Sequence, residues 1–298
     1  MPPIDCNLGT DCFVQQYVDR DPTDGARDFR CQSLSYDGHK GTDFALRSRA
    51  QMEQGVDVVA AASGTVRAIR DGMADQLVTS ENRAALAGRD CGNGLVIDHA
   101  DGWSTQYCHF KRGSVQVRSG DKVTSGDVLG QVGLSGRTQF PHVHITVRKD
   151  DAVIDPFDPT GTSTCAVPSA ETLWQTPIAY QPGGVIATGF ADAVPEYDTI
   201  KAGQAHRAEL PADAPALVVF GYIFGARAGD TLHLRITGPD GEVIDRAVDL
   251  DRTQAQLFRA IGKRRRDAHW PVGIYEGTAT LIRRAEIIGT QRNVVEIR

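Results

Sequence analysis

The sequence lacks any long apolar run. No segment approaches the roughly 20 apolar residues that a helix needs to span a bilayer, which argues against a transmembrane segment. The first five residues also lack the apolar stretch of a secretory signal peptide. If the protein is exported, its signal peptide has therefore been removed from this sequence.

An excess of positive charge is missing too. The 32 Lys and Arg residues are outnumbered by 38 Asp and Glu residues, which gives a net charge of −6, whereas domains that bind nucleic acid are usually basic. The one basic run, residues 263–266, is interpreted as a solvated loop. We therefore expect no nucleic-acid partner. The 298 residues, 41% of them hydrophobic, are enough for one large domain or two ordinary ones.

Cysteine is absent beyond position 165, and no Cys-x-x-Cys motif occurs, which argues against a cysteine-rich metal site. The number of cysteines is even, which is consistent with three disulfide bonds and with a periplasmic or secreted protein. Of the possible pairings, one can be argued. Strands at 94–99 and 103–109, joined by a turn at 100–102, would bring Cys91 close to Cys108. The six cysteines lie at positions 6, 12, 31, 91, 108 and 165.

Helical periodicity is scarce, so the chain is predicted to be mainly β. The best helix candidate covers residues 80–87, with Ser80 as a possible N-cap. Short β-like runs punctuated by glycine fill the first half; they lie at residues 56–66, 95–99, 104–109, 115–117, 128–132 and 143–147.

The sequence pattern indicates a division into two parts near residue 170. Residues 156–182 are rich in Pro, Thr and Ser and indicate a linker or a wrapping segment. Further strand-like runs follow, with a strong turn signal at Gly238-Pro239-Asp240-Gly241, and their spacing predicts an immunoglobulin-like β-sandwich. These runs lie at residues 217–224, 231–237, 243–250, 255–261, 273–283 and 293–297.

Two short clusters combine imidazole and carboxylate groups, which are ligands that suit zinc. His39 and Asp43 lie four residues apart, and His142 and His144 lie two apart. On a β-strand, residues i and i+2 project to the same face, so both imidazoles of the second cluster should enter one shared space. No His-Glu-x-x-His motif occurs, so a glutamate base is not indicated.

Several segments, taken together, resemble the lysostaphin-type zinc metalloendopeptidases. The similarity runs in collinear order from about residue 28 to residue 157, and it is specific because the motifs agree in type, order and spacing. The segments that carry it are Gly38-His39-Lys40-Gly41-Thr42-Asp43-Phe44-Ala45, residues 58–66, residues 92–99, Tyr107-Cys108-His109-Phe110, residues 133–137 and Pro141-His142-Val143-His144.

The resemblance implies a role for each of five residues. His39, Asp43 and His144 match the zinc ligands, which would leave a fourth tetrahedral position for water. His109 and His142 match the two catalytic histidines that act on the water and on the scissile peptide, and which of them is the base stays open. The sequence departs from the family at Ile145-Thr146, where an aromatic and an acidic residue are common.

The resemblance also implies an organisation and a function. A zinc metallopeptidase domain, antiparallel β with a groove, would cover residues 1–168 with its core at 28–157, and a linker at 169–182 would lead to a β-sandwich accessory domain at 183–298. The expected function is zinc-dependent (Zn²⁺) hydrolysis of peptide bonds in peptidoglycan stems or cross-bridges. Two alternatives remain: a non-catalytic wall-binding or hydrolase-activating protein, and a zinc peptidase that acts on other peptides. The second domain is a candidate surface for a wall or protein partner.

Overall fold

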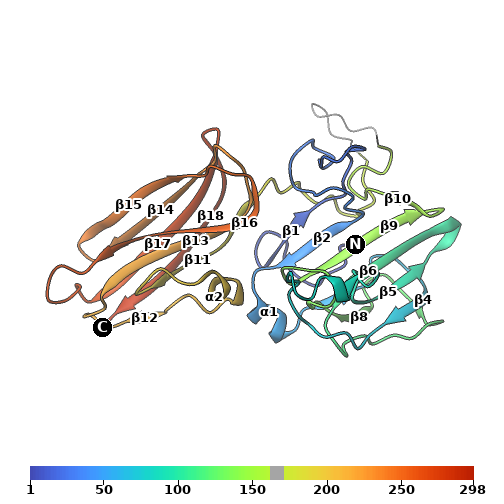
Figure 1. The fold of residues 1–298 in the computed structure, drawn as a ribbon, viewed down its shortest axis with the longest axis horizontal. Helices are drawn as coiled ribbons and strands as arrows, with labels where there is room; N and C mark the ends of the chain where they lie inside the picture. Colours follow the sequence, from blue (N-terminus) through green and yellow to red (C-terminus); the bar gives the residue numbers. More distant parts are fainter. Residues whose placement is uncertain (162–170) are drawn as a thin grey trace. The chain divides into compact units, whose positions relative to one another are not determined.

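The computed structural model describes residues 1–161 and 171–298, which form two compact units, Met1–Tyr180 and Gln181–Arg298 (Figure 1). Both units are built mainly of antiparallel strands, so the predicted mainly β class is confirmed. Cys165 and the boundary expected at residue 168 lie outside the described residues.

The first unit contains an eight-stranded sheet in the order β1-β2-β9-β6-β5-β4-β7, with β10 paired to β9. A second, two-stranded sheet joins β3 and β8. Helix α1, Arg49–Gln54, is N-capped by the hydroxyl of Ser48. The strands are β1 (Cys12–Gln16), β2 (Thr42–Leu46), β3 (Asp57–Val59), β4 (Gly64–Arg70), β5 (Asn93–Asp98), β6 (Trp103–Phe110), β7 (Lys122–Val123), β8 (Val128–Gln131), β9 (His142–Lys149) and β10 (Ala152–Ile154).

The three central strands β2, β9 and β6 fix the position of the histidine motifs. In the antiparallel pairing of β2 with β9, Asp43 lies opposite His144, and Ala45 lies opposite His142. On its other side β9 pairs with β6, where His144 lies opposite Cys108. Fully buried β-branched and aromatic residues between the motif positions, such as Phe44 and Val143, anchor these strands in the core.

The helix expected at residues 80–87 does not form. Only a 3-10 turn at Ala84–Leu86 is present, and the side chains of Thr79 and Asn82 bond to each other's backbone amides in place of a cap at Ser80. Leu86 is the one buried side chain in this stretch, so a helix would have no apolar stripe to bury. The strand expected at 115–117 is also absent.

The segment after β10 wraps onto the first unit. Trp174 is 5% exposed and packs edge-to-face against Phe44 and Phe157. The hydroxyl of Tyr180 donates to the buried carboxylate of Asp28 at 2.7 Å. Residues 171–180 therefore belong to the first unit and do not act as a linker, because their aromatic side chains are part of its core.

Two disulfide bonds are placed in the described residues. Cys91 is bonded to Cys108 across the β5–β6 hairpin, as the sequence predicts. Cys6 is bonded to Cys12 at the start of β1. Cys31 is also disulfide-bonded.

A buried carboxyl group makes the stability of the first unit depend on pH. Asp155 accepts the amide N–H of Phe157 through Oδ1 at 2.9 Å, whereas its buried Oδ2 has no hydrogen-bond partner among the described residues. Burial raises the pKa of Asp155 to about 7. The folded state therefore keeps a proton that the unfolded chain releases near pH 4. This contribution to stability is full below about pH 4 and is lost as the pH rises through about 7.

Replacing Asp155 by asparagine is expected to make the stability of the first unit depend less on pH. In the wild type the carboxyl group should lower the free energy of unfolding by up to about 4 kcal/mol between acidic and mildly alkaline pH. Urea unfolding of the full chain at about pH 5 and about pH 8 covers about 2.7 kcal/mol of this difference. The exposed Asp151→Asn is the control. An undiminished pH dependence in Asp155→Asn would contradict the assignment.

The second unit is a β-sandwich. One sheet has the order β11-β13-β16 and the other β12-β18-β17-β14-β15, and their inner faces share a core that contains Phe190, Leu234 and Tyr275. Among the seven long strands, the first, second and fifth form one sheet, an immunoglobulin-like arrangement. The elements are β11 (Gly184–Ala191), α2 (Tyr197–Ala202), β12 (Glu209–Leu210), β13 (Ala216–Ala226), β14 (Thr231–Gly238), β15 (Gly241–Asp249), β16 (Gln254–Arg264), β17 (Gly273–Arg283) and β18 (Glu286–Ile297).

Candidate metal centre and catalytic site

Five predicted site residues come together in the first unit. His39 lies in the loop before β2, Asp43 on β2, His109 near the end of β6, and His142 and His144 on β9. All except His144 are buried, and His144 is partly exposed. The site is therefore assembled from three adjacent strands and from segments about a hundred residues apart.

Three of these side chains converge as a metal-binding group. His39 Nε2 lies 3.2 Å from Asp43 Oδ1 and 3.2 Å from His144 Nδ1, and the last two atoms are 2.8 Å apart. Zinc bonds of about 2.0–2.1 Å would place tetrahedral ligand atoms roughly 3.3 Å from one another. Two of the separations match this value and the third is somewhat shorter, so the residues fit a zinc ion.

The second ring nitrogen of His39 and that of His144 each contact another polar group. His39 Nδ1 lies 2.7 Å from the carbonyl oxygen of Tyr17, and because a carbonyl only accepts, Nδ1 donates and Nε2 keeps a lone pair. His144 Nε2 lies 2.9 Å from Thr146 Oγ1. Such outer contacts orient metal-binding histidines and fix their tautomers. A cation among the inward lone pairs would offset their mutual repulsion.

A glycine makes room for this arrangement. A Cβ atom on Gly41 would lie 2.4 Å from the carbonyl oxygen of Ile145 and 2.6 Å from His144 Nε2. The motif between His39 and Asp43 therefore needs a glycine at this position, because any side chain would displace His144 or the β9 backbone.

His109 and His142 form a second pair beside the metal-binding group, with ring centroids 4.6 Å apart. Their Nδ1 atoms donate to the backbone carbonyls of Ser135 at 2.8 Å and Phe140 at 2.9 Å. Each neutral ring therefore keeps its Nε2 lone pair. His142 Nε2 lies 3.5 Å from Asp43 Oδ1, further than either of the other imidazole nitrogens.

A β-bulge directs His109 toward the site. In the pairing of β6 with β5, Cys108 lies opposite Gly94 and Phe110 lies opposite Asn93, so His109 is the extra residue. Its φ angle of 67° is in the left-handed region, which is uncommon for histidine. Bulges of this kind change the direction of a side chain next to active sites.

The electrostatic environment keeps the carboxylate charged and the second pair neutral. Burial would raise the pKa of Asp43, but the adjacent His39 and His142 hold it well below its ordinary value. Burial and the neighbouring imidazoles hold the pKa of His109 well below its ordinary value. Burial also lowers the pKa of His142, although Asp43 opposes this shift. Neutral imidazoles can accept protons at neutral pH.

Aromatic rings and a polar loop border the site. The Tyr36 ring, 51% exposed, lies 4.4 Å from the His39 ring, and the Phe140 ring lies 4.4 Å from that of His142. Asp75, from the segment 71–90 between β4 and β5, accepts the amide N–H of Leu134 at 2.7 Å. This segment therefore supports the one whose carbonyl group holds His109, a contact that the sequence did not indicate.

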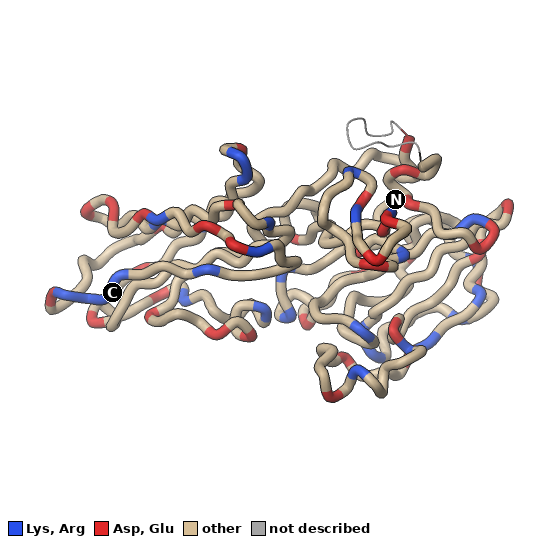
Figure 2. The backbone as a smooth tube through the Cα atoms, turned by 45° about the horizontal axis from the view of Figure 1, so that its top comes forward, with Lys and Arg blue, Asp and Glu red and all other residues tan. Residues whose placement is uncertain are grey.

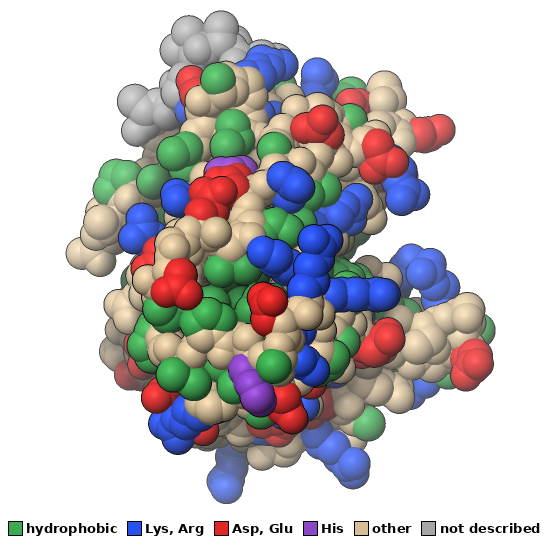
Figure 3. Space-filling model, turned by 90° about the vertical axis from the view of Figure 1, so that its left-hand side faces the viewer, with side chains coloured by type: hydrophobic (Ala, Val, Ile, Leu, Met, Phe, Trp, Pro, Cys, Tyr) green, Lys and Arg blue, Asp and Glu red, His purple; other side chains and the backbone are tan. Residues whose placement is uncertain are grey.

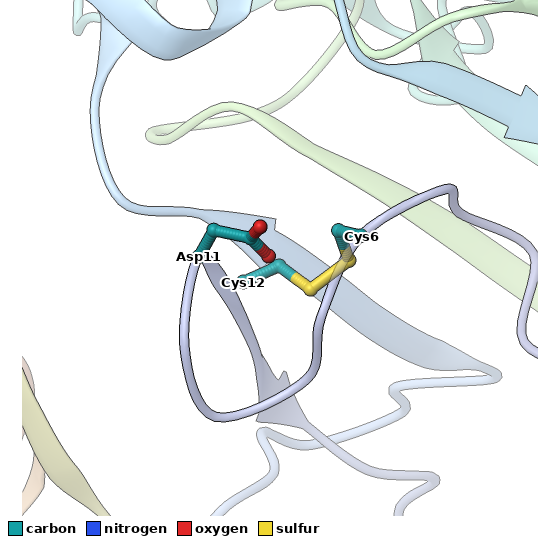
Figure 4. Close-up of side chains that lie close together, drawn as sticks. All are labelled: Cys6, Asp11 and Cys12. Atoms are coloured by element: carbon teal, nitrogen blue, oxygen red, sulfur yellow. A yellow bond between two sulfur atoms is a disulfide. The ribbon is translucent and has the colours of Figure 1, made fainter.

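A second group of metal-binding residue types, Cys6, Asp11 and Cys12, is not a metal site of the same kind (Figure 4). The two sulfur atoms are bonded to each other, so neither is a thiolate. Asp11 accepts the amide and side-chain N–H groups of Asn7. These contacts describe a disulfide-closed turn.

The antiparallel sheet with a buried His-Asp-His group defines the class of the first unit, a metallopeptidase-like domain, and the comparisons name its family. Residues 37–156 match Peptidase family M23. The match over these residues confirms the predicted resemblance. Members of the family include peptidoglycan endopeptidases.

Three curated relatives are similar over this domain. The chain is 30% identical over 121 residues to the cell division protein DipM of Caulobacter vibrioides, covering 40% of this chain and 18% of that protein. It is 31% identical over 106 residues, 36% of this chain, to two others. These are the DD-carboxypeptidase/endopeptidase Mpg of Neisseria meningitidis serogroup B (22% covered) and the peptidoglycan DD-endopeptidase ShyA of Vibrio cholerae (19% covered). The chain thus spans about a fifth of the length of these relatives.

Across the described parts of the chain, no helix has both the length and the apolar character needed to cross a membrane.

Proposed function

We propose that the protein is a zinc endopeptidase that hydrolyses peptide bonds in peptidoglycan stems or cross-bridges. The observation that carries the proposal is the set of five converging side chains, in which three imidazoles are anchored to backbone carbonyls through Nδ1 and direct Nε2 inward. The peptidoglycan substrate is supported by the similarity to the DD-endopeptidase ShyA.

His39, Asp43 and His144 would hold the zinc ion through Nε2, Oδ1 and Nδ1. When bound, zinc acts as a Lewis acid that lowers the pKa of water to about 7 and polarises a carbonyl group. The Nε2 atoms of His109 and His142 supply the proton-transfer groups. One of them accepts a proton from the attacking water. Because neither Nε2 carries a proton beforehand, that same proton passes on through the pair to the leaving amine. Both rings are neutral at the start because burial lowers the pKa of each.

A peptidoglycan digestion assay tests the proposal. The purified protein, with about one zinc per chain, should release soluble peptide fragments from purified sacculi. Glycine-rich and generic peptides in parallel reactions identify the preferred bond. Cleavage of the generic peptides alone would instead identify a peptidase for other substrates. Binding to sacculi with no cleavage of any substrate would favour the non-catalytic alternative, which predicts an incomplete residue set.

The disulfide bonds support a periplasmic or secreted location, because such bonds persist in oxidising compartments. Fractionation of the producing cells, with the free thiol content measured in each fraction, tests this location.

Thr146 is expected to strengthen zinc binding, because its hydroxyl contacts the nitrogen of His144 that faces away from Asp43. Thr146→Val keeps the shape of the buried side chain and removes the hydroxyl, so we expect roughly tenfold weaker zinc affinity. Thr146→Ser should retain the wild-type affinity. Competition with a chelator measures the affinity directly. Equal zinc affinity in Thr146→Val and the wild type would contradict this role.

A further inference from the structure

The second unit has a cavity of about 290 Å³ at one end of the β-sandwich. One wall is the β14–β15 turn at 238–243, which belongs to the five-stranded sheet. The other is residues 263–271, which are the end of β16 in the three-stranded sheet and the segment after it. Trp270 and Tyr275 contribute apolar lining, and both are largely buried. Loops at the ends of such sandwiches are common binding surfaces.

Four consecutive cationic residues line this cavity, on a protein whose net charge is −6. Elsewhere along the backbone, acidic and basic residues are interspersed (Figure 2). Lys and Arg side chains gather near the middle of the face shown in Figure 3, next to hydrophobic side chains. These cations outnumber the three carboxylates of the lining, so the cavity has a small net positive charge that favours anionic groups.

The four cations have different roles. Arg265 Nη1 donates to the backbone carbonyls of Asp267 and Ala268 at 2.7 Å each, so this side chain shapes the loop. Lys263, Arg264 and Arg266 are exposed, and none forms an ion pair with a carboxylate in the part of the chain that the structure describes. Their charges remain available to a ligand.

We infer that this cavity binds a carboxylate-bearing peptide segment of peptidoglycan; the inference rests on the proposed function. Guanidinium groups bind carboxylates through paired hydrogen bonds. Asp240, Glu242 and Asp267 also line the cavity, so its lining has both signs of charge. Stem peptides carry both carboxylates and amines and match this lining, whereas a uniformly anionic membrane would meet the three carboxylates.

Two triple variants of equal charge test the inference in the full chain. The cavity variant is Lys263→Gln, Arg264→Gln and Arg266→Gln, which leaves Arg265 in place. The control is Arg246→Gln, Arg252→Gln and Arg292→Gln, three exposed residues of the same unit that do not line the cavity. Each variant changes the net charge from −6 to −6 − 3 = −9. All proteins also carry His142→Ala to prevent digestion, and thermal unfolding checks that each one folds.

Co-sedimentation with purified sacculi gives the readout. The cavity variant should bind at least about tenfold more weakly than its parent, since three exposed charge pairs together contribute about 1.4 kcal/mol. The control should bind within about twofold of the parent. Amidation of the sacculus carboxylates should weaken binding by the parent to the level of the cavity variant.

Three results would overturn the inference: wild-type binding by the cavity variant, equal loss in both variants, or cavity-dependent binding to phosphatidylglycerol vesicles without binding to sacculi. The proposed function is tested separately with soluble stem peptides and proteins that retain His142. If these peptides stay uncut while cavity-dependent binding persists, only the catalytic proposal fails. If they are cut and binding does not depend on the cavity, only the present inference fails.

Discussion

Replacing Asp43 by alanine is expected to remove zinc from the protein and to abolish hydrolysis of peptidoglycan. The Asp43 carboxylate is 2% exposed, and its Oδ1 atom lies within 3.5 Å of His39, His142 and His144. It is the one anionic ligand in the group and offsets much of the charge of a divalent cation. Without it, three imidazoles would face a buried cation with no compensating charge.

Metal analysis after gel filtration measures the effect. The wild type should contain about one zinc per chain, and Asp43→Ala should contain almost none. Asp90→Ala is the matched control, because this carboxylate is half-exposed and pairs with Arg137. It should keep both zinc and activity. Stoichiometric zinc in Asp43→Ala would show that the metal is held elsewhere.

The second large effect concerns His142, which should be dispensable for zinc and essential for activity. Its Nε2 atom is further from Asp43 Oδ1 than the nearest atoms of His39 and His144, and its ring centroid lies 4.6 Å from that of His109. His142→Ala removes a proton-transfer group, which typically contributes 10²- to 10⁴-fold in rate. We therefore expect a loss of roughly that size in kcat with about one zinc per chain retained.

His144→Ala separates the two roles, because it should lose both zinc and activity. Parallel measurements of metal content and of fragment release from sacculi are sufficient. His109→Ala should behave like His142→Ala. A fully active His142→Ala protein would mean that the two histidines on β9 do not divide into a ligand and a proton-transfer group.

The sequence by itself predicts the shared face of His142 and His144, whereas it assigns His39, Asp43 and His109 to the same site only through the resemblance. His142 and His144 share one face of β9 through the two-residue period of a strand, and the antiparallel pairing then sets Asp43 opposite His144. His39 precedes β2 by a few residues, so its distance from Asp43 is limited by the chain itself.

The orientation of His109 could not be derived from periodicity. The bulge breaks the alternation of β6 at that residue, and nothing in the local composition signals an extra residue. The outer contacts are equally non-local, since the carbonyl groups of Tyr17 and Ser135 reach His39 and His109 from other segments. The same reason applies to residues 171–180, whose composition left a linker and a wrapping segment both open, and only the structure shows that Trp174 is buried in the core.

The bulge at His109 has a consequence for engineering. A left-handed backbone at a histidine costs about 1–2 kcal/mol, and such strain is common where the backbone positions a functional group. A screen that rewards thermostability alone would therefore favour changes that relax the backbone at position 109. Such changes would redirect one of the two proposed proton-transfer groups, so stability screens of this domain need a selection for activity alongside them.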